Sequence, residues 1–137
     1  MNDLLIDTNV LIYAIDEDSL YFSQSQRIIC HPNVSLYTTS KNISEFLAVM
    51  TRGTENALSI HDALNAVSDF DKFLNILYPT KDTYRYFMRL LRKYNPVGLK
   101  IHDFEIASIG IANGIDQIVT FNQKDFNQIE ELYLYPL

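Results

Sequence analysis

The sequence has no tryptophan, a single cysteine and no long apolar run. Cys30 has no second cysteine to pair with, so an internal disulfide is excluded and nothing requires an oxidising compartment. The apolar runs are only a few residues long, which excludes a membrane-spanning helix. The beginning, MNDLLIDTNV, has an acid at its third position and no basic stretch, so it does not match a secretory signal peptide. We therefore expect a cytoplasmic protein without a membrane partner.

Positive charge is also scarce. The chain has 11 lysine and arginine residues against 17 aspartate and glutamate residues, a net charge of −6 at pH 7. A protein that binds nucleic acid through its own cations normally has a basic surface. Two interpretations remain: the protein binds no nucleic acid, or its acids are concentrated in a site that works through divalent cations.

Internal repeats, low-complexity tracts and linker-like stretches are missing too, which predicts one domain spanning residues 1–137. This length is enough to bury a hydrophobic core without disulfides or metals as cross-links. Hydrophobic residues make up 47% of the chain and charged residues 20%, as in ordinary globular proteins.

Short apolar strands alternate with amphipathic helices along the chain. The run Leu4–Ile6 has no polar alternation, which is typical of a strand buried on both faces of a parallel sheet. Alternating strands and helices form βαβ units, so we predict an α/β fold with a mostly parallel sheet and helices on both faces. Further strands are expected at Leu36–Thr38, Asn75–Tyr78, Gln117–Phe121 and Leu132–Tyr135, with helices over residues 8–15, 40–52, 60–74, 80–94 and 103–113.

Acidic residues fall where such a sheet would bind a ligand, beyond the carboxyl ends of its strands. Asp7 directly follows the first strand, and Asp103 opens a helix that follows a loop. Glu45 lies one helical turn past the second strand, away from the apolar stripe of its helix, and Asp125 lies in the polar turn after the strand that ends at Phe121.

Each acid has a simpler explanation when taken alone, because Asp7 and Asp103 could cap helices and Glu45 could be a solvated surface residue. Taken together they predict a cluster, and converging carboxylates repel one another unless they bind a cation. Oxygen ligands favour Mg²⁺ or Mn²⁺ over zinc. The spacing typical of zinc ligands is not found for Cys30, His31, His61 or His102.

Four segments in this order resemble the PIN-domain family, and in particular the VapC-type toxins of toxin–antitoxin pairs: IDTNVLIY, NISEF, HDFEIAS and IVTFNQKDF. The resemblance covers the chain from Asp3 to Pro136. It implies a three-layer α/β/α sandwich and a Mg²⁺- or Mn²⁺-dependent endoribonuclease. It also implies a homodimer that is inhibited by a small antitoxin protein.

The resemblance assigns metal-binding and catalytic roles to Asp7, Glu45 and Asp103. Many relatives have a fourth acid where this chain has Asn122, and others have asparagine there with an acid three residues later, which matches Asp125. We therefore expect Asp125 to be the fourth acid, with Asn122 and the hydroxyl of Thr120 assisting. This departure leaves open whether one or two metal ions bind.

The chemistry that fits these residues is hydrolysis of RNA phosphodiester bonds by metal-activated water. A bound cation also turns an acidic cleft into one that accepts a polyanion, which reconciles the net charge of −6 with an RNA substrate. Arg52, Lys100 and Lys124 are the candidates for holding the flanking phosphates.

Two other functions are compatible with parts of the pattern. A catalytically degenerate PIN fold that binds RNA or a protein partner is favoured by Asn122, whereas the intact Asp7, Glu45 and Asp103 argue against it. An aspartyl phosphatase with Asp7 as nucleophile would usually need a second aspartate two residues later, where this chain has Asn9.

The helix over residues 80–94 has more aromatic residues than one buried face can hold, and surplus apolar surface often marks an interface. These residues, which add to the expectation of a homodimer, are Tyr84, Tyr86, Phe87 and Tyr94.

Overall fold

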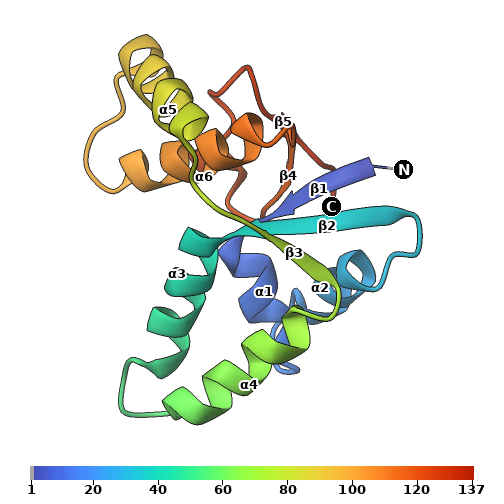
Figure 1. Cartoon of the computed structure of the whole chain (residues 1–137). Coiled ribbons are helices and arrows are strands. Elements are labelled where there is room, and N and C mark those ends of the chain that lie inside the picture. The colour runs from blue at the N-terminus through green and yellow to red at the C-terminus, as the bar shows by residue number, and fades with distance from the viewer. Residues whose placement is uncertain (1) are drawn as a thin grey trace.

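A computed structural model, which describes residues 2–137, contains one five-stranded sheet (Figure 1). The strands lie in the order β3-β2-β1-β4-β5, and every neighbouring pair is parallel. Their bounds are β1 (Asn2–Ile6), β2 (Val34–Thr39), β3 (Leu74–Leu77), β4 (Gln117–Val119) and β5 (Tyr133–Leu134). The predicted α/β class and parallel sheet are thereby confirmed.

Helices cover both faces of the sheet and complete the predicted three-layer sandwich (Figure 1). One face carries α1 (Thr8–Ile15), α2 (Phe22–Ile29), α3 (Ser40–Thr51) and α4 (Ile60–Phe70). The other face carries α5 (Lys81–Tyr94) and α6 (Lys100–Ala112), followed by the short 3-10 helix η1 (Gln123–Asp125). In residues 2–137, no helix is long and apolar enough to span a membrane.

The central strand β1 explains why its sequence shows no polar alternation. Leu4 and Ile6 pack into the core beneath α1–α4, whereas Leu5 packs into the core beneath α5 and α6, and all three are fully buried. On the α6 side, Gly110 allows a close approach, because a Cβ there would lie 2.9 Å from Leu5 Cδ2. Helix α6, which contains Asp103, therefore packs closely against strand β1, which directly precedes Asp7.

Helix α2 was not predicted, and the physical reason lies in its composition. The segment FSQSQRII is largely polar, and its residue before the first turn, Tyr21, makes no side-chain capping hydrogen bond. Its buried side chains are few (Ser25, Ile28 and Ile29), so no helical apolar stripe is visible in the sequence.

Several element ends also differ from the prediction. Helix α3 ends at Thr51 instead of residue 52, and Thr39 caps its start in a reciprocal capping box with Asn42. Helix α4 ends at Phe70, and Leu74 pairs with Leu36 in the sheet although it continues the helical spacing. Helix α6 begins at Lys100 without a side-chain cap, so Asp103 lies in its first turn instead of opening it. Strand β4 stops at Val119, short of Phe121.

Candidate active site

Asp7 lies at the carboxyl end of β1 and is only 7% exposed. Its Oδ1 accepts hydrogen bonds from the backbone N of Thr8 at 2.9 Å and from Asn42 Nδ2 at 3.2 Å. Its Oδ2 accepts from Thr120 Oγ1 at 2.7 Å and from Asn9 Nδ2 at 3.4 Å. Asp7 therefore caps α1 and also stands at the centre of a polar cluster, so the two explanations weighed from the sequence both describe it.

A chain of hydrogen bonds connects this centre to Glu45. Thr8 Oγ1 donates to Glu45 Oε2 at 2.9 Å and accepts from Asn42 Nδ2 at 2.9 Å. Asn42 is buried and is itself held by the capping box with Thr39. Asn42, in the first turn of α3, and Thr8 thus hold Glu45 beside the amino end of α1.

Asp103 and Asp125 complete the cluster from the other side. Both are partly buried, and within residues 2–137 neither carboxylate accepts a hydrogen bond or forms an ion pair. The pKa of Asp103 is raised from 3.8 to about 7, first by burial and then by repulsion from Asp125, Asp7 and Glu45, while Lys100 opposes the shift. A carboxylate whose neighbours are mostly acids is energetically costly when it is charged.

The pKa of Asp7 is raised as well, from 3.8 to about 6. Burial is the largest cause, and repulsion from Glu45 and Asp125 adds to it, whereas the hydrogen bonds from Thr120 and Thr8 lower it. The four predicted acids are therefore brought together as one electrostatically coupled group.

The donor set of this group fits a hard divalent cation, because it consists of carboxylate oxygens. Two of the four side chains, Asp103 and Asp125, accept no hydrogen bond within residues 2–137. As they stand, the side chains of residues 2–137 include no group of three acids, histidines or cysteines ready to surround an ion. Mg²⁺ is usually bound through one or two carboxylates and several waters, so direct contact with every acid is not required. Asp103 and Asp125 have both carboxylate oxygens available for it, and Glu45 has Oε1.

The three predicted phosphate-binding cations do not share one location. Lys100 lies beside Asp103, and its Nζ contacts the backbone carbonyl of Lys124 at 3.4 Å. Arg52 follows the last turn of α3, seven residues or about 10 Å of helix beyond Glu45, in a hollow with Ile15. The structure therefore brings two of these cations to the cluster and places Arg52 away from it.

Asn122 and Thr120 also differ in their placement. Thr120 is buried and donates to Asp7, as described above. Asn122 is exposed, and it contacts the cluster through its backbone N, which donates to Thr120 Oγ1 at 3.1 Å. Of the two candidates for the fourth acidic position, Asp125 is the one that is electrostatically coupled to Asp7 and Asp103.

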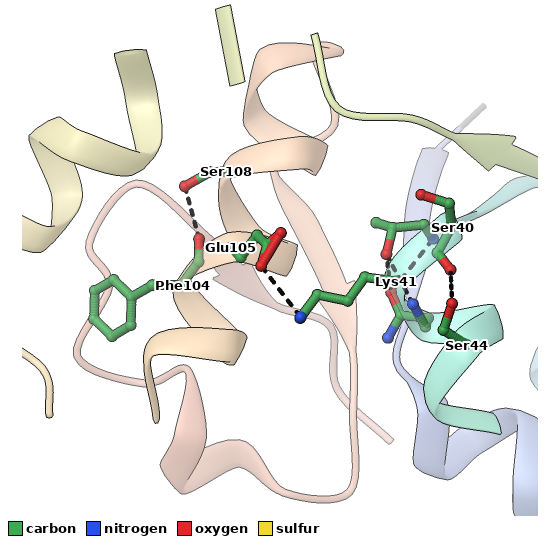
Figure 2. A network of polar contacts seen from close by, with 8 residues as sticks. Ser40, Lys41, Ser44, Phe104, Glu105 and Ser108 are labelled. Atoms are coloured by element: carbon green, nitrogen blue, oxygen red, sulfur yellow. Dashed lines mark hydrogen bonds and ion pairs between the residues drawn. The ribbon is translucent and has the colours of Figure 1, made fainter. Parts of the chain in front are cut away.

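Some residues that shape the site were not singled out from the sequence. Asn9 and Asn42 orient Asp7, and the only signal for them was their presence inside the segments IDTNVLIY and NISEF. Lys41 and Glu105 form an ion pair of 3.2 Å that links the first turn of α3 to the second turn of α6 (Figure 2). These two helices lie on opposite faces of the sheet, so the pair spans its carboxyl edge, and no sequence signal relates the two residues.

A parallel α/β/α sandwich with a carboxylate cluster at the carboxyl edge of its sheet defines the class of this protein. The PIN domain model matches residues 4–132, and the chain belongs to the PIN domain family. No curated protein matches the sequence.

Solved structures with the same fold include VapBC2 from Rickettsia felis, bound to a promoter DNA fragment, with a TM-score of 0.73, 21% identity and 97% of each chain covered. VapBC-1 from nontypeable Haemophilus influenzae has a TM-score of 0.69 at 20% identity, over 97% of this chain and 96% of the other. Mycobacterium tuberculosis VapC20, described as a toxin that cleaves the sarcin-ricin loop, has a TM-score of 0.71 at 13% identity, over 92% of this chain and 95% of the other. At these identities the likeness establishes the fold.

The raised pKa of Asp103 predicts a pH-dependent stability. Because the folded state holds this proton more tightly than the unfolded chain, the stabilisation is present below about pH 4 and is lost as the pH rises to about 7. In EDTA, Asp103→Asn should therefore be more stable than the wild type at pH 8, by about 0.5–2 kcal/mol. Its free energy of unfolding should also fall less between pH 5.5 and 8.

Chemical denaturation across this pH range measures both effects. Asp62→Asn is the matched control, since Asp62 is an exposed acid in the first turn of α4 and should change neither quantity. Parallel pH profiles for the wild type and Asp103→Asn would contradict the electrostatic coupling of the cluster.

Proposed function

We propose that this protein is a Mg²⁺- or Mn²⁺-dependent endoribonuclease and the toxin of a toxin–antitoxin pair. PIN-domain proteins are generally nucleases that use divalent metals. The observation that carries the proposal is the convergence of Asp7, Glu45, Asp103 and Asp125 at the carboxyl edge of the sheet. A cluster of four repelling acids lowers stability, and a cation-dependent activity gives it a chemical use.

The four acids have different tasks in this proposal. Asp103 and Asp125 hold the ion, since their oxygens have no other donors within residues 2–137. Asp7 is held rigidly by its four hydrogen bonds and supplies a fixed negative charge beside them. Glu45, anchored by Thr8, orients water at the edge of the cluster. When bound, the ion lowers the pKa of water and neutralises charge on the scissile phosphate and the leaving oxygen.

The same hydrogen bonds argue against the aspartyl phosphatase alternative. A nucleophilic carboxylate needs an accessible oxygen with a free lone pair, but Asp7 is 7% exposed and both of its oxygens accept two hydrogen bonds. We therefore assign Asp7 to the support of the metal site.

Removal of one charge from the cluster tests the activity. Asp7→Asn should lower RNA cleavage in Mn²⁺ at least about a hundredfold, because groups at a metal centre contribute several kcal/mol to the transition state. Cleavage should also stop in EDTA. The rate is measured with labelled single-stranded RNA, and Asp116→Asn, at an exposed position before the amino end of β4, should cleave like the wild type.

Cleavage that persists in EDTA or in Asp7→Asn would overturn the metal-dependent mechanism. RNA or protein binding without any cleavage would indicate the degenerate binding module instead.

The RNA phosphates are held, in this proposal, by Lys100 and Lys124. In an Asp7→Asn background, which keeps the RNA intact, Lys100→Gln should weaken RNA binding and reduce the slope of log K against log salt by about 1. Arg52→Gln should leave both unchanged, because Arg52 lies at the far end of α3. Fluorescence anisotropy from 50 to 200 mM salt provides the measurement. Equal effects of the two substitutions would show that binding is nonspecific.

We also propose a small antitoxin as partner, as in the similar toxin–antitoxin complexes, and a homodimer. The aromatic surplus on α5 is smaller than the sequence suggested. Tyr94 is used internally, since its hydroxyl donates to Glu131 at 2.6 Å, whereas Tyr84 remains 57% exposed and borders a hollow together with Met88.

Tyr84 and Met88 supply the apolar centre of the proposed dimer contact. Light scattering at micromolar concentrations should give twice the monomer mass, and Tyr84→Glu should shift the protein toward the monomer. Tyr133→Glu, at an equally exposed tyrosine on β5, is the control and should leave the mass unchanged. A wild-type monomer throughout this range would contradict the dimer.

A further inference from the structure

An open hollow of about 660 Å³ lies directly beside the carboxylate cluster. Thr120 and Asp125 are among its lining residues, so it adjoins the proposed metal site. Its size falls within the range of about 300–1,000 Å³ that is usual for small-ligand pockets. Two further lining residues, Tyr21 and Gln24, come from the turn before α2 and from α2 itself.

Two aromatic residues line the hollow, Tyr21 and Phe121, and they belong to a cluster of three rings with Tyr13. Tyr21 packs on Phe121 with ring centroids 4.6 Å apart and a tilt of 34°, and on Tyr13 at 5.1 Å and 42°. Tyr13 in turn meets the edge of Phe121 at 5.4 Å. Tyr21 is nevertheless 42% exposed. An aromatic ring that is supported by two others and still open to solvent is a rigid platform for stacking.

Hydrogen bonds connect the segment that contains Phe121 to Asp7 in the carboxylate cluster. The backbone N of Phe121 donates to Asn9 Oδ1 at 3.2 Å, and Asn9 also donates to Asp7 and to Thr120. Phe121 follows Thr120, whose hydroxyl donates to Asp7. The ring that supports Tyr21 is therefore one residue away from a direct partner of Asp7.

Amide side chains line the hollow and can form hydrogen bonds with the polar edge of a planar ligand. Gln24, Asn122 and Gln123 line it, and each amide has both donor and acceptor atoms. Such groups match the edges of unpaired bases, while aromatic rings stack on their faces. Lys124, at the same rim, supplies a cation for an adjoining phosphate.

We propose that this hollow is a base-binding subsite in which Tyr21 stacks an unpaired nucleobase of the RNA next to the scissile phosphate. The inference rests on the proposed ribonuclease function and adds to it the group that positions the strand. Every base has a stacking face, so Tyr21 itself selects single-stranded RNA rather than a sequence. The amides of Gln24, Asn122 and Gln123 add a preference among bases.

The test removes the base and the ring separately and then together. Single-stranded RNAs of one sequence carry one abasic residue at each position around the cut. In the wild type, an abasic residue at one flanking position should lower kcat/KM about 5- to 100-fold, the usual effect of one base–aromatic stack. Tyr21→Ala should cause a similar loss on intact RNA and little further loss on the abasic RNA, because the two changes remove the same contact.

Three variants separate stacking from folding. Tyr21→Phe keeps the ring and should behave as the wild type, whereas Tyr21→Leu keeps apolar packing against Phe121 without an aromatic face and should behave as Tyr21→Ala. Tyr133→Ala removes a tyrosine that is 62% exposed on β5 and should change nothing. Thermal melting of each variant shows that it is folded.

Several outcomes would overturn the subsite: unchanged cleavage by Tyr21→Ala, losses that multiply between Tyr21→Ala and the abasic RNA, or full activity of Tyr21→Leu. Loss of binding to a protein partner with unchanged RNA cleavage would assign the hollow to that partner instead. If the wild type cleaves no RNA, the proposed function fails. The subsite is then tested by anisotropy with the same RNAs, where Kd must show the same dependence on base and ring.

Discussion

The repulsion among four carboxylates at the carboxyl edge of the sheet is the constraint on which the rest of the structure depends. Burial and like charges raise the pKa of both Asp7 and Asp103, so the folded chain holds these groups together at an energetic cost. The surrounding core must offset that cost. It does so through a strand, Leu4–Ile6, that is fully buried on both faces, and through α6, which packs tightly on it at Gly110.

Hydrogen bonds divide the cluster into a fixed half and an open half. Asp7 and Glu45 are oriented by Thr8, Asn42 and their neighbours, which leaves them little freedom to turn away from each other. Asp103 and Asp125 have no such partners within residues 2–137. A cation that approached the cluster would therefore meet two preorganised charges and two carboxylates free to rotate toward it, which lowers the reorganisation that binding requires.

The location of the site could be predicted from the sequence. A strand with no polar alternation indicates a parallel sheet, and parallel sheets bind ligands beyond the carboxyl ends of their strands. The same reasoning predicted the positions of Asp7, directly after β1, and of Glu45, in the helix that follows β2, and the structure has both residues there. Arg52 was misplaced because a helix that follows a parallel strand runs back from that edge, so the loop beyond α3 belongs to the opposite end of the molecule. Lys41 and Glu105 could not be paired, because their contact arises only when helices from the two faces meet.

The net charge of −6 acquires a physical meaning from this arrangement. A polyanion that approaches the cluster without a cation meets like charges, and Lys100 and Lys124 are too few to offset four acids. A bound divalent ion neutralises part of the acidic charge, and the two lysines then act with it on the polyanion. Scarcity of positive charge therefore does not oppose RNA binding in the proposed site. It makes that binding conditional on the metal, so that affinity for the strand and the capacity to cut it depend on the same ion.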